Sequence, residues 1–228
     1  MNILAIDTST PWAAVVIRRS NGLQFAGTTD SGRRHGRELV PMIHQLLDRA
    51  EIRPADLEGI AVGLGPGSYT GLRVGVMAAK TLAYATGAAV VGLDSLELLA
   101  RNAPAEASRI SVVLDAQRGD VHLAEFSRAD RGSELIREGP TVSLAVKDLA
   151  ERLAGRFFAF APGLEKFAET LPAEIRSNGL LASHPDPEQL MEMAKTALSL
   201  GVHENVWSLE PIYARRSAAE DQWERLGR

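Results

Sequence analysis

The sequence predicts an α/β protein built from two lobes of similar plan. Strand-forming runs begin the chain and recur after residue 108, and in each half they are followed by alternating helical and strand patterns. The stretch "RNAPAEAS" between the halves is small, polar and contains proline, as linkers do. We therefore expect an N-terminal lobe at 1–103, a second lobe at 109–213, and a partly helical polar tail at 214–228.

The N-terminal half should begin with a three-stranded antiparallel meander. Its strands are "NILAIDTS", "AAVVIRR" and "LQFAGTTD", and Asn21-Gly22 separates the last two. Asn-Gly between strands favours a tight hairpin, because both residues accept positive φ. Apolar residues at helical spacing predict a helix over 36–50, with Pro41 in its first turn or at a kink.

A glycine-rich motif, "GLGPGSYTGLRVG", follows the next predicted strand, "LEGIAVGLG". An apolar helix over 71–86 comes after it and ends at Gly87. The strand "AAVVGLD" and a short helix to about Arg101, with Ser95 as its N-cap, complete the half. The half thus has the element order βββαβαβα.

The second half repeats the plan. Paired strands, "RISVVLDA" and "DVHLAEFSR", enclose a turn at 117–119, and "GSELIREGPTVS" continues in extended form. Helices are expected at 144–155 and 164–174, with the strand "RFFAFAPG" between them. A helix over 186–201 is the strongest prediction, because Asp186 can cap it, Pro187 fits its first position and Gly201 can stop it.

Composition excludes several classes of site. The 228 residues include no cysteine, which rules out disulfides, zinc thiolates and cysteine nucleophiles. No apolar run reaches the roughly 18 residues of a membrane span, and no signal peptide is evident, so we expect a cytoplasmic protein. The net charge of −4 disfavours strong binding of nucleic acid by the chain alone. A local basic run, Arg33-Arg34-His35 with Arg37, is interpreted as a solvated loop, with an RNA-facing patch as the alternative.

The glycine motif fits neither of two familiar phosphate loops. It lacks the lysine of G-x-x-x-x-G-K-[ST], and Gly71 comes one position too late for G-x-G-x-x-G. Within the helix, Gly71, Gly75 and Ala79 recur every four residues and form a stripe that admits a close neighbour. That neighbour could belong to the same chain or to a partner subunit.

No known catalytic arrangement is present. No histidine pair, His-Glu-x-x-His or G-x-S-x-G motif occurs. Asp7, Asp94 and Asp115 end or leave apolar strands, where α/β sheets bind ligands, and could hold magnesium and a phosphate or simply cap loops. The hydroxyls of Thr8-Ser9-Thr10 make Asp7 the strongest of the three candidates.

Four segments together resemble the bacterial TsaB (YeaZ-like) family: "ILAIDTSTPWAAVVI", "GLGPGSYTGLRVGVMAAKTLAYATGAAVVGLDSLELLA", "VLDAQRGDVHLAEF" and "LEPIYARR". The resemblance implies the actin/Hsp70/hexokinase-like (ASKHA) fold, with two lobes that each contain a mixed sheet flanked by helices. It also implies participation in the formation of threonylcarbamoyladenosine on tRNA. The metal-binding histidines of the catalytic paralogue, TsaD, fall on Ser95 and Leu99, of which leucine cannot bind a metal and serine is a poor substitute.

The resemblance therefore implies a non-catalytic subunit that pairs with a TsaD-like catalytic paralogue and works with a TsaE-like ATPase. We expect no catalytic or metal-binding residue here, metal and ATP on the partner subunits, tRNA contact mainly through partners, and a homodimer when the chain is alone. The expected interface consists of Leu39, Ile43, Leu46, Gly71, Arg73, Gly75 and Ala79. A vestigial nucleotide cleft with weak ATP or ADP binding would use Asp7, Thr8, Ser9, Thr10, Gly65, Gly67 and Ser68.

Two other functions stay open at this point. The chain could be a stand-alone ATPase or phosphotransferase of the same fold, acting through Asp7, Thr8–Thr10 and the glycine loop. A peptidase is the weaker alternative, because the wider family once carried a glycoprotease label.

Overall fold

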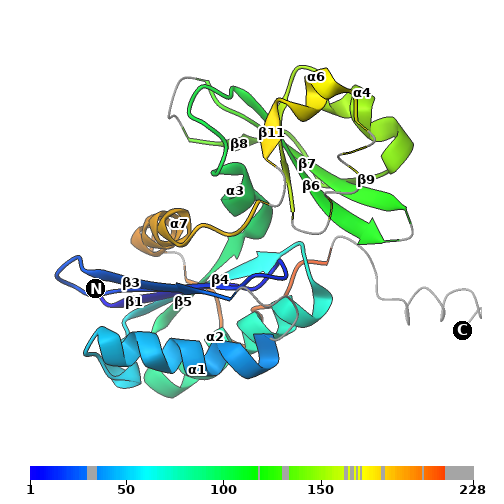
Figure 1. The fold of residues 1–228 in the computed structure, drawn as a ribbon. Coiled ribbons are helices and arrows are strands. Elements are labelled where there is room, and N and C mark those ends of the chain that lie inside the picture. The colour runs from blue at the N-terminus through cyan, green and yellow to red at the C-terminus, as the bar shows by residue number, and fades with distance from the viewer. Residues whose placement is uncertain are drawn as a thin grey trace, which may run out of the picture.

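A computed structural model describes residues 1–29, 35–117, 119–129, 134–161, 164, 167, 169, 171–180, 183–201 and 203–213. These residues form two β-sheets that stand apart, with helices α3 and α7 between them and further helices on their outer sides (Figure 1). Two lobes, each with a mixed sheet flanked by helices, were predicted, and this fold class is confirmed.

The first sheet has the strand order β3-β2-β1-β4-β5. Its strands are β1 (Ile3–Asp7), β2 (Ala14–Arg18), β3 (Gln24–Thr28), β4 (Gly59–Gly65) and β5 (Ala89–Asp94). The first three form the predicted antiparallel meander, and β4 and β5 run parallel to β1 and to each other. The carboxyl ends of β1, β4 and β5 therefore meet at one edge, which places Asp7, Gly65 and Asp94 close together.

The hairpin between β2 and β3 differs in detail from the prediction. Only Gly22 takes a positive φ, of 96°, whereas Asn21 does not. The backbone N–H of Arg19 bonds to the carbonyl of Leu23, and that of Gly22 bonds to the carbonyl of Arg19. The loop is thus longer than a two-residue turn, and only one residue needs the left-handed conformation.

Helices α1 (His35–Arg49) and α2 (Tyr69–Thr86) cover one face of the first sheet (Figure 1). Pro41 lies inside α1 on its exposed side, beyond the first turn. Helix α2 begins two residues before the predicted start, because the Ser68 hydroxyl accepts a hydrogen bond from the Gly71 N–H and caps the helix. Gly87, with φ 74°, ends it as predicted. A short 3-10 helix, η1 (Pro54–Asp56), leads into β4.

Helix α7 (Pro187–Ser199) covers the opposite face of the first sheet, although it follows the second lobe in sequence (Figure 1). Asp186 caps it and Pro187 opens it, as predicted. Its buried residues share a core with side chains of β1, β2, β4 and β5; they are Leu190, Met191, Met193, Ala194 and Leu198. The expected assignment of all of 109–213 to the second lobe differs from this packing, because an amphipathic helix lies where its apolar face is buried, not where the chain order suggests.

Helix α3 (Ser95–Ala100) joins the two lobes. Leu96 and Leu99 are buried in the core of the second lobe, and Leu98 is buried in that of the first. The expectation that Ser95 caps this helix is wrong. Asp94 is the N-cap, and its carboxylate accepts bonds from the backbone N–H groups of Leu96 and Glu97.

The second sheet has the order β11-β10-β6-β7-β8, and β9 also pairs with β7. Its strands are β6 (Arg109–Gln117), β7 (Asp120–Ser127), β8 (Ile136–Arg137), β9 (Val142–Ala145), β10 (Phe157–Phe160) and β11 (Gly179–Leu180). Strands β6 and β7 are the predicted antiparallel pair, and β10 and β11 extend the sheet in parallel.

The helices of this lobe are shorter than predicted. The segment 144–155 ends strand β9, passes through the 3-10 helix η2 (Val146–Asp148) and is α-helical only in α4 (Leu149–Leu153). Helix α6 (Ala173–Arg176) begins only at the end of the region predicted as helix 164–174, in which residues 165, 166, 168 and 170 lie outside the described residues. The tail from 214 and residues 30–34, which include Arg33 and Arg34, also lie outside them. No helix in the described ranges is long and apolar enough to cross a membrane.

Candidate functional site

Asp7, at the carboxyl end of β1, is the centre of a buried polar cluster. Its Oδ1 accepts hydrogen bonds from the backbone N–H of Ser9, at 2.9 Å, and from the Ser9 hydroxyl, at 2.6 Å. Its Oδ2 accepts one from the Ser95 hydroxyl at 2.6 Å. Asp7 is fully buried, so these bonds offset the loss of its hydration. Ser95, which sequence analysis treated only as a lost metal ligand and a cap, is thus a member of the site.

The glycine motif folds against this cluster. The backbone N–H of Gly65 donates to the Ser95 hydroxyl at 3.1 Å, and that of Ser68 donates to the Ser9 carbonyl at 2.6 Å. Gly65 has a positive φ of 102°, and its peptide bond to Pro66 is cis. The structure therefore brings together the residues predicted to form a nucleotide cleft, from the β1–β2 loop and the motif.

Two glycines are needed because a side chain would overlap the cluster. A Cβ at Gly63 would collide with the Asp7 carboxylate, and a Cβ at Gly75 would collide with the Thr8 hydroxyl. That hydroxyl donates to the Gly71 carbonyl at 2.8 Å, on the first turn of α2. The neighbour that approaches the glycine stripe is therefore the β1–β2 loop of the same chain.

Thr10, in the same β1–β2 loop, forms hydrogen bonds with the backbone of Trp12. Its hydroxyl donates to the Trp12 carbonyl at 2.8 Å and accepts from the Trp12 N–H at 3.2 Å. The Asp7 carboxylate and the hydroxyl groups of Thr8, Ser9 and Thr10, which could contact a phosphate, thus all form hydrogen bonds to other groups of the protein. A phosphate would have to displace bonds to Asp7 and would face its negative charge.

The two positions that would carry the metal ligands of a catalytic paralogue point inward. Ser95 is 1% exposed and Leu99 is 0% exposed, and Leu99 packs in the core of the second lobe. Glu97, on the same helix, forms an ion pair with Arg101 at 2.7 Å. Within the part of the chain that the structure describes, no three His, Asp or Glu side chains gather as a metal site.

Six of the seven expected interface residues are core residues of this single chain. Those six are Leu39, Ile43, Leu46, Gly71, Gly75 and Ala79, all of which are buried, whereas Arg73 is exposed. The expectation that the first six form a surface for a partner therefore needs correction. Helical spacing identifies an apolar stripe, but it cannot tell whether the chain's own loops and strands cover it.

A different face of α2 is exposed. Tyr69, Arg73, Met77 and Tyr84 follow one another at intervals of four and seven residues, so they lie on one side of the helix. The exposed fractions of Tyr69, Met77 and Tyr84 are 41%, 62% and 70%. We call these four residues the α2 ridge. Their spacing could have revealed the ridge in the sequence, but the large residues on the other faces of α2 concealed it.

The C-terminal segment 203–213, here called the strap, lies along α2 beside the ridge. Backbone bonds from Glu204 to Val90 and from Ile212 to Leu64 fix it to the first lobe, and Leu209 is 1% exposed. The Lys80 ammonium donates to the carbonyls of Trp207 and Leu209 at 3.2 and 3.1 Å.

Aromatic side chains join the strap to the ridge. The rings of Tyr69 and Tyr213 are 4.9 Å apart, and those of Tyr84 and Trp207 are 5.3 Å apart. Arg73 lies 4.1 Å from the Tyr69 ring centre and donates to the Tyr213 hydroxyl at 3.0 Å. Trp207 and Ile212 remain 71% and 53% exposed, so ridge and strap form one surface rich in aromatic and aliphatic groups. Residues 209–213 of the strap contribute to the family resemblance, but the strap has no helix or strand periodicity from which its packing could be predicted.

Comparison with protein families gives one matching model. Residues 29–148 match the TsaD family, described as tRNA N6-adenosine threonylcarbamoyltransferase. The matched part runs from the end of β3 through α1, α2 and α3 to the start of α4.

Relatives match over nearly the whole chain. The tRNA threonylcarbamoyladenosine biosynthesis protein TsaB of Bacillus subtilis is 33% identical, with 98% of each chain covered. The protein of the same name from Escherichia coli is 27% identical, over 99% of this chain and 98% of that one. The solved structure of YeaZ from Pseudomonas aeruginosa superposes with a TM-score of 0.78 at 27% identity, over 93% of this chain and 99% of that one. The YeaZ-like fold implied by the sequence resemblance, with two lobes that each contain a mixed sheet, is thereby confirmed.

Proposed function

Because the chain belongs to the family of the tRNA threonylcarbamoyladenosine biosynthesis protein TsaB, we propose that it acts in this modification as the non-catalytic partner of a TsaD-like subunit. A role in threonylcarbamoyladenosine biosynthesis follows from the family. The partner is a threonylcarbamoyltransferase related to this chain, and it supplies the metal and the reaction centre. The chain itself contributes a docking surface.

The surface formed by the α2 ridge and the strap is the observation that supports this proposal. Met77, Tyr84 and Trp207 each expose more than half of their side-chain surface on adjoining elements. Exposed aromatic residues and methionine are enriched at protein interfaces, where they become buried on association. Charged groups at the surface, Arg73 and Lys80, already bond to the strap, so association would not leave them without partners.

The positions of Ser95 and Leu99 support a non-catalytic role. To bind a metal there, Ser95 would have to give up its bonds to Asp7 and Gly65, and Leu99 has no ligand atom. The buried cluster around Asp7 supports at most weak binding of ATP or ADP by this chain. We infer that the ATP-dependent steps occur on a TsaE-like ATPase and on the catalytic subunit, and that the tRNA is contacted mainly through these partner subunits.

A binding experiment with matched variants tests the proposal. The chain and the TsaD-like protein of the same organism are mixed, and the dissociation constant is measured by calorimetry. Met77→Glu and Tyr84→Glu should weaken binding at least tenfold, because each places a charge in an apolar contact. Leu200→Glu is the control, since Leu200 is 72% exposed but lies at the end of α7, on the opposite face of the first sheet.

Formation of the modified nucleoside is the second measurement. Transfer of threonylcarbamoyl to tRNA, followed by mass spectrometry of the nucleosides, should require the wild-type chain and fail with Met77→Glu. Equal binding by Met77→Glu, Tyr84→Glu and wild type would refute the surface. Full tRNA modification without the chain would refute its role in the complex.

The state of the isolated chain and its nucleotide affinity give further tests. We propose that the chain pairs with itself through the same surface when the partner is absent, so Met77→Glu should convert a dimer to a monomer in sedimentation experiments. Calorimetry with ATP and magnesium should show affinity no tighter than millimolar. Micromolar affinity with turnover would instead favour a stand-alone ATPase or phosphotransferase.

A further inference from the structure

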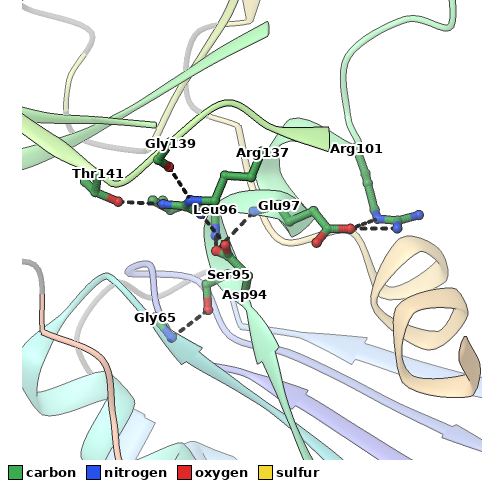
Figure 2. Close-up of polar contacts among 9 residues, drawn as sticks. All are labelled: Gly65, Asp94, Ser95, Leu96, Glu97, Arg101, Arg137, Gly139 and Thr141. Atoms are coloured by element: carbon green, nitrogen blue, oxygen red, sulfur yellow. Dashed lines mark hydrogen bonds and ion pairs between the residues drawn. The ribbon is translucent and has the colours of Figure 1, made fainter. Parts of the chain in front are cut away.

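An ion pair connects the two lobes beside the buried cluster. Arg137, on β8 of the second sheet, reaches Asp94, at the end of β5 in the first (Figure 2). Its own lobe positions the guanidinium: Nε donates to the Gly139 carbonyl at 3.0 Å, and Nη2 donates to the Thr141 hydroxyl at 2.7 Å. The group also lies 5.3 Å from the ring centre of Phe126. Three contacts thus fix the guanidinium to the second lobe, and the bond to Asp94 ties that lobe to the first.

Asp94 uses both carboxylate oxygens. Oδ2 takes the bond from Arg137, while Oδ1 accepts the N–H groups of Leu96 and Glu97 at 2.8 and 3.3 Å and so caps α3. The next residue, Ser95, faces the other way and bonds to Asp7 and Gly65 (Figure 2 shows the Gly65 bond). Of these two consecutive residues, Asp94 therefore contacts the second lobe, and Ser95 contacts the buried cluster of the first lobe.

The hydrogen-bonded chain continues from the cluster to α2. Asp7 holds Ser9, the Ser9 carbonyl accepts the Ser68 N–H, and Ser68 caps α2 through the Gly71 N–H. The Thr8 hydroxyl adds a second bond to the same turn, at the Gly71 carbonyl. Asp7, Thr8, Ser9 and Ser95 are buried, whereas Ser68, which carries the bonds on to α2, is exposed. Buried close-packed groups do not shift independently, so a displacement of Ser95 is passed on to Asp7 and to Thr8 and Ser9.

From these contacts we propose that the Asp94–Arg137 pair is a latch between the lobes, and that it couples their relative orientation to the first turn of α2. The inference rests on the proposed function, because the α2 ridge is the surface assigned to the TsaD-like partner. The latched form holds the first turn of α2 in the geometry that the partner recognises. Latching and partner binding therefore favour each other, and linkage requires the effect to be reciprocal.

The orientation of the lobes can be measured on the chain alone. Since the chain has no cysteine, spin labels can be placed cleanly at Glu151→Cys on α4 and Ser199→Cys on α7, both exposed positions. Arg137→Gln and Asp94→Asn should each broaden and shift the distance distribution between the labels. Asparagine is itself a good N-cap, so Asp94→Asn removes the charge but keeps α3 capped.

Arg101→Gln is the matched control, because it removes an ion pair of similar exposure, Glu97–Arg101, that connects α3 only to its own C-cap residue (Figure 2). Its distance distribution should equal that of the parent. Circular dichroism of each variant excludes misfolding as the cause of a change. Unchanged distances in both Arg137→Gln and Asp94→Asn would refute the latch.

The coupling is measured with the partner added. Both latch variants should bind the TsaD-like protein about fivefold or more weakly, the lower end of typical coupling between sites, while Arg101→Gln binds as wild type. Addition of the partner should restore the narrow distance distribution of Arg137→Gln. Altered distances with unchanged affinity would refute the coupling. Failure of the wild-type chain to bind at all would instead contradict the proposed function, and the distance measurement on the chain alone would still decide the latch.

Discussion

Gly75→Ala provides the sharpest test of why the helix carries a glycine stripe. The new Cβ would overlap the Thr8 hydroxyl and lie 3.4 Å from the Thr8 Cβ and Cγ2. Thr8 is fully buried, so the loop can relieve the overlap only by moving away from Gly71 and lengthening a 2.8 Å hydrogen bond. A stripe that served only an external partner would instead accept alanine in the isolated chain.

Opposing effects determine how much Gly75→Ala changes the free energy of unfolding. Overpacking of a close-packed interior costs about 1–3 kcal/mol. Loss of the hydrogen bond between Thr8 and Gly71 adds about 1 kcal/mol. Alanine recovers up to about 1 kcal/mol, because glycine is a poor helix former. The free energy of unfolding should therefore fall by about 1–3 kcal/mol, and the Tm should fall by about 2–4 °C for each kcal/mol in a chain of this size.

A double-mutant cycle isolates the cause. Thr8→Ala removes the atom that the new Cβ would overlap, so Gly75→Ala in that background should be neutral or stabilising by up to about 1 kcal/mol. Urea and thermal unfolding, followed by circular dichroism, measure each corner of the cycle. Gly36→Ala is the matched control: Gly36 is also helical, nothing lies within 4 Å of its Cβ position, and alanine should stabilise slightly. Unchanged or increased stability of Gly75→Ala alone would refute the packing argument.

Three further outcomes are expected. Ser95→Ala should lower the free energy of unfolding in urea by about 2–4 kcal/mol, since it leaves Asp7 and a backbone N–H short of buried hydrogen bonds; a loss below about 0.5 kcal/mol would contradict this. Leu209→Ala should cost about 2–5 kcal/mol, measured in the same way, because the side chain is 1% exposed in the core. Arg53 lowers the pKa of Asp56 to about 2. The stability that this carboxylate contributes is therefore present above its unfolded pKa of about 3.9 and is lost as pH falls through about 2. Carboxyl NMR titration should show this midpoint, and Arg53→Gln should raise it.

Local signals in the sequence predicted most of the first lobe. The meander, α2 and α7 follow from alternation, capping and stop residues that act within a few positions of one another, and these predicted elements agree with the structure. The second lobe was predicted less well, because its strands and helices are short. A four-residue strand such as β9 carries only about two cycles of its two-residue pattern, and a five-residue helix such as α4 carries only about one and a half turns, too few for a pattern to be recognised.

The candidate site was predicted in composition but not in arrangement. Hydroxyls after β1 and glycines after β4 indicated that two loops meet, as they do. That Ser95 bonds to Asp7, across 88 positions, depends on β1, β4 and β5 being parallel neighbours. Only the sheet topology brings their carboxyl ends together, and no local pattern encodes it.

The interface residues were misplaced for a related reason. Helix α2 is apolar on most faces, so its spacing gives no preference between an internal and an external contact. The strap and the β1–β2 loop determine which faces of α2 are internal, because they cover some faces of the helix. The ridge of Tyr69, Arg73, Met77 and Tyr84 is left exposed. Both segments are irregular, and their packing is a long-range property.

The cluster around Asp7 connects the two roles considered for the glycine motif, which are phosphate binding and close packing against a neighbour. For a phosphate to enter, Asp7 would have to lose hydrogen bonds to Ser9 and Ser95, each worth about 1.5–3 kcal/mol because the acceptor is charged. The same bonds position Ser68 and Thr8 against the first turn of α2. Opening the cleft would thus release the helix that carries the proposed partner surface. The hydroxyl and carboxylate groups that a phosphate would have to contact are thus the groups that hold the first turn of α2 in place.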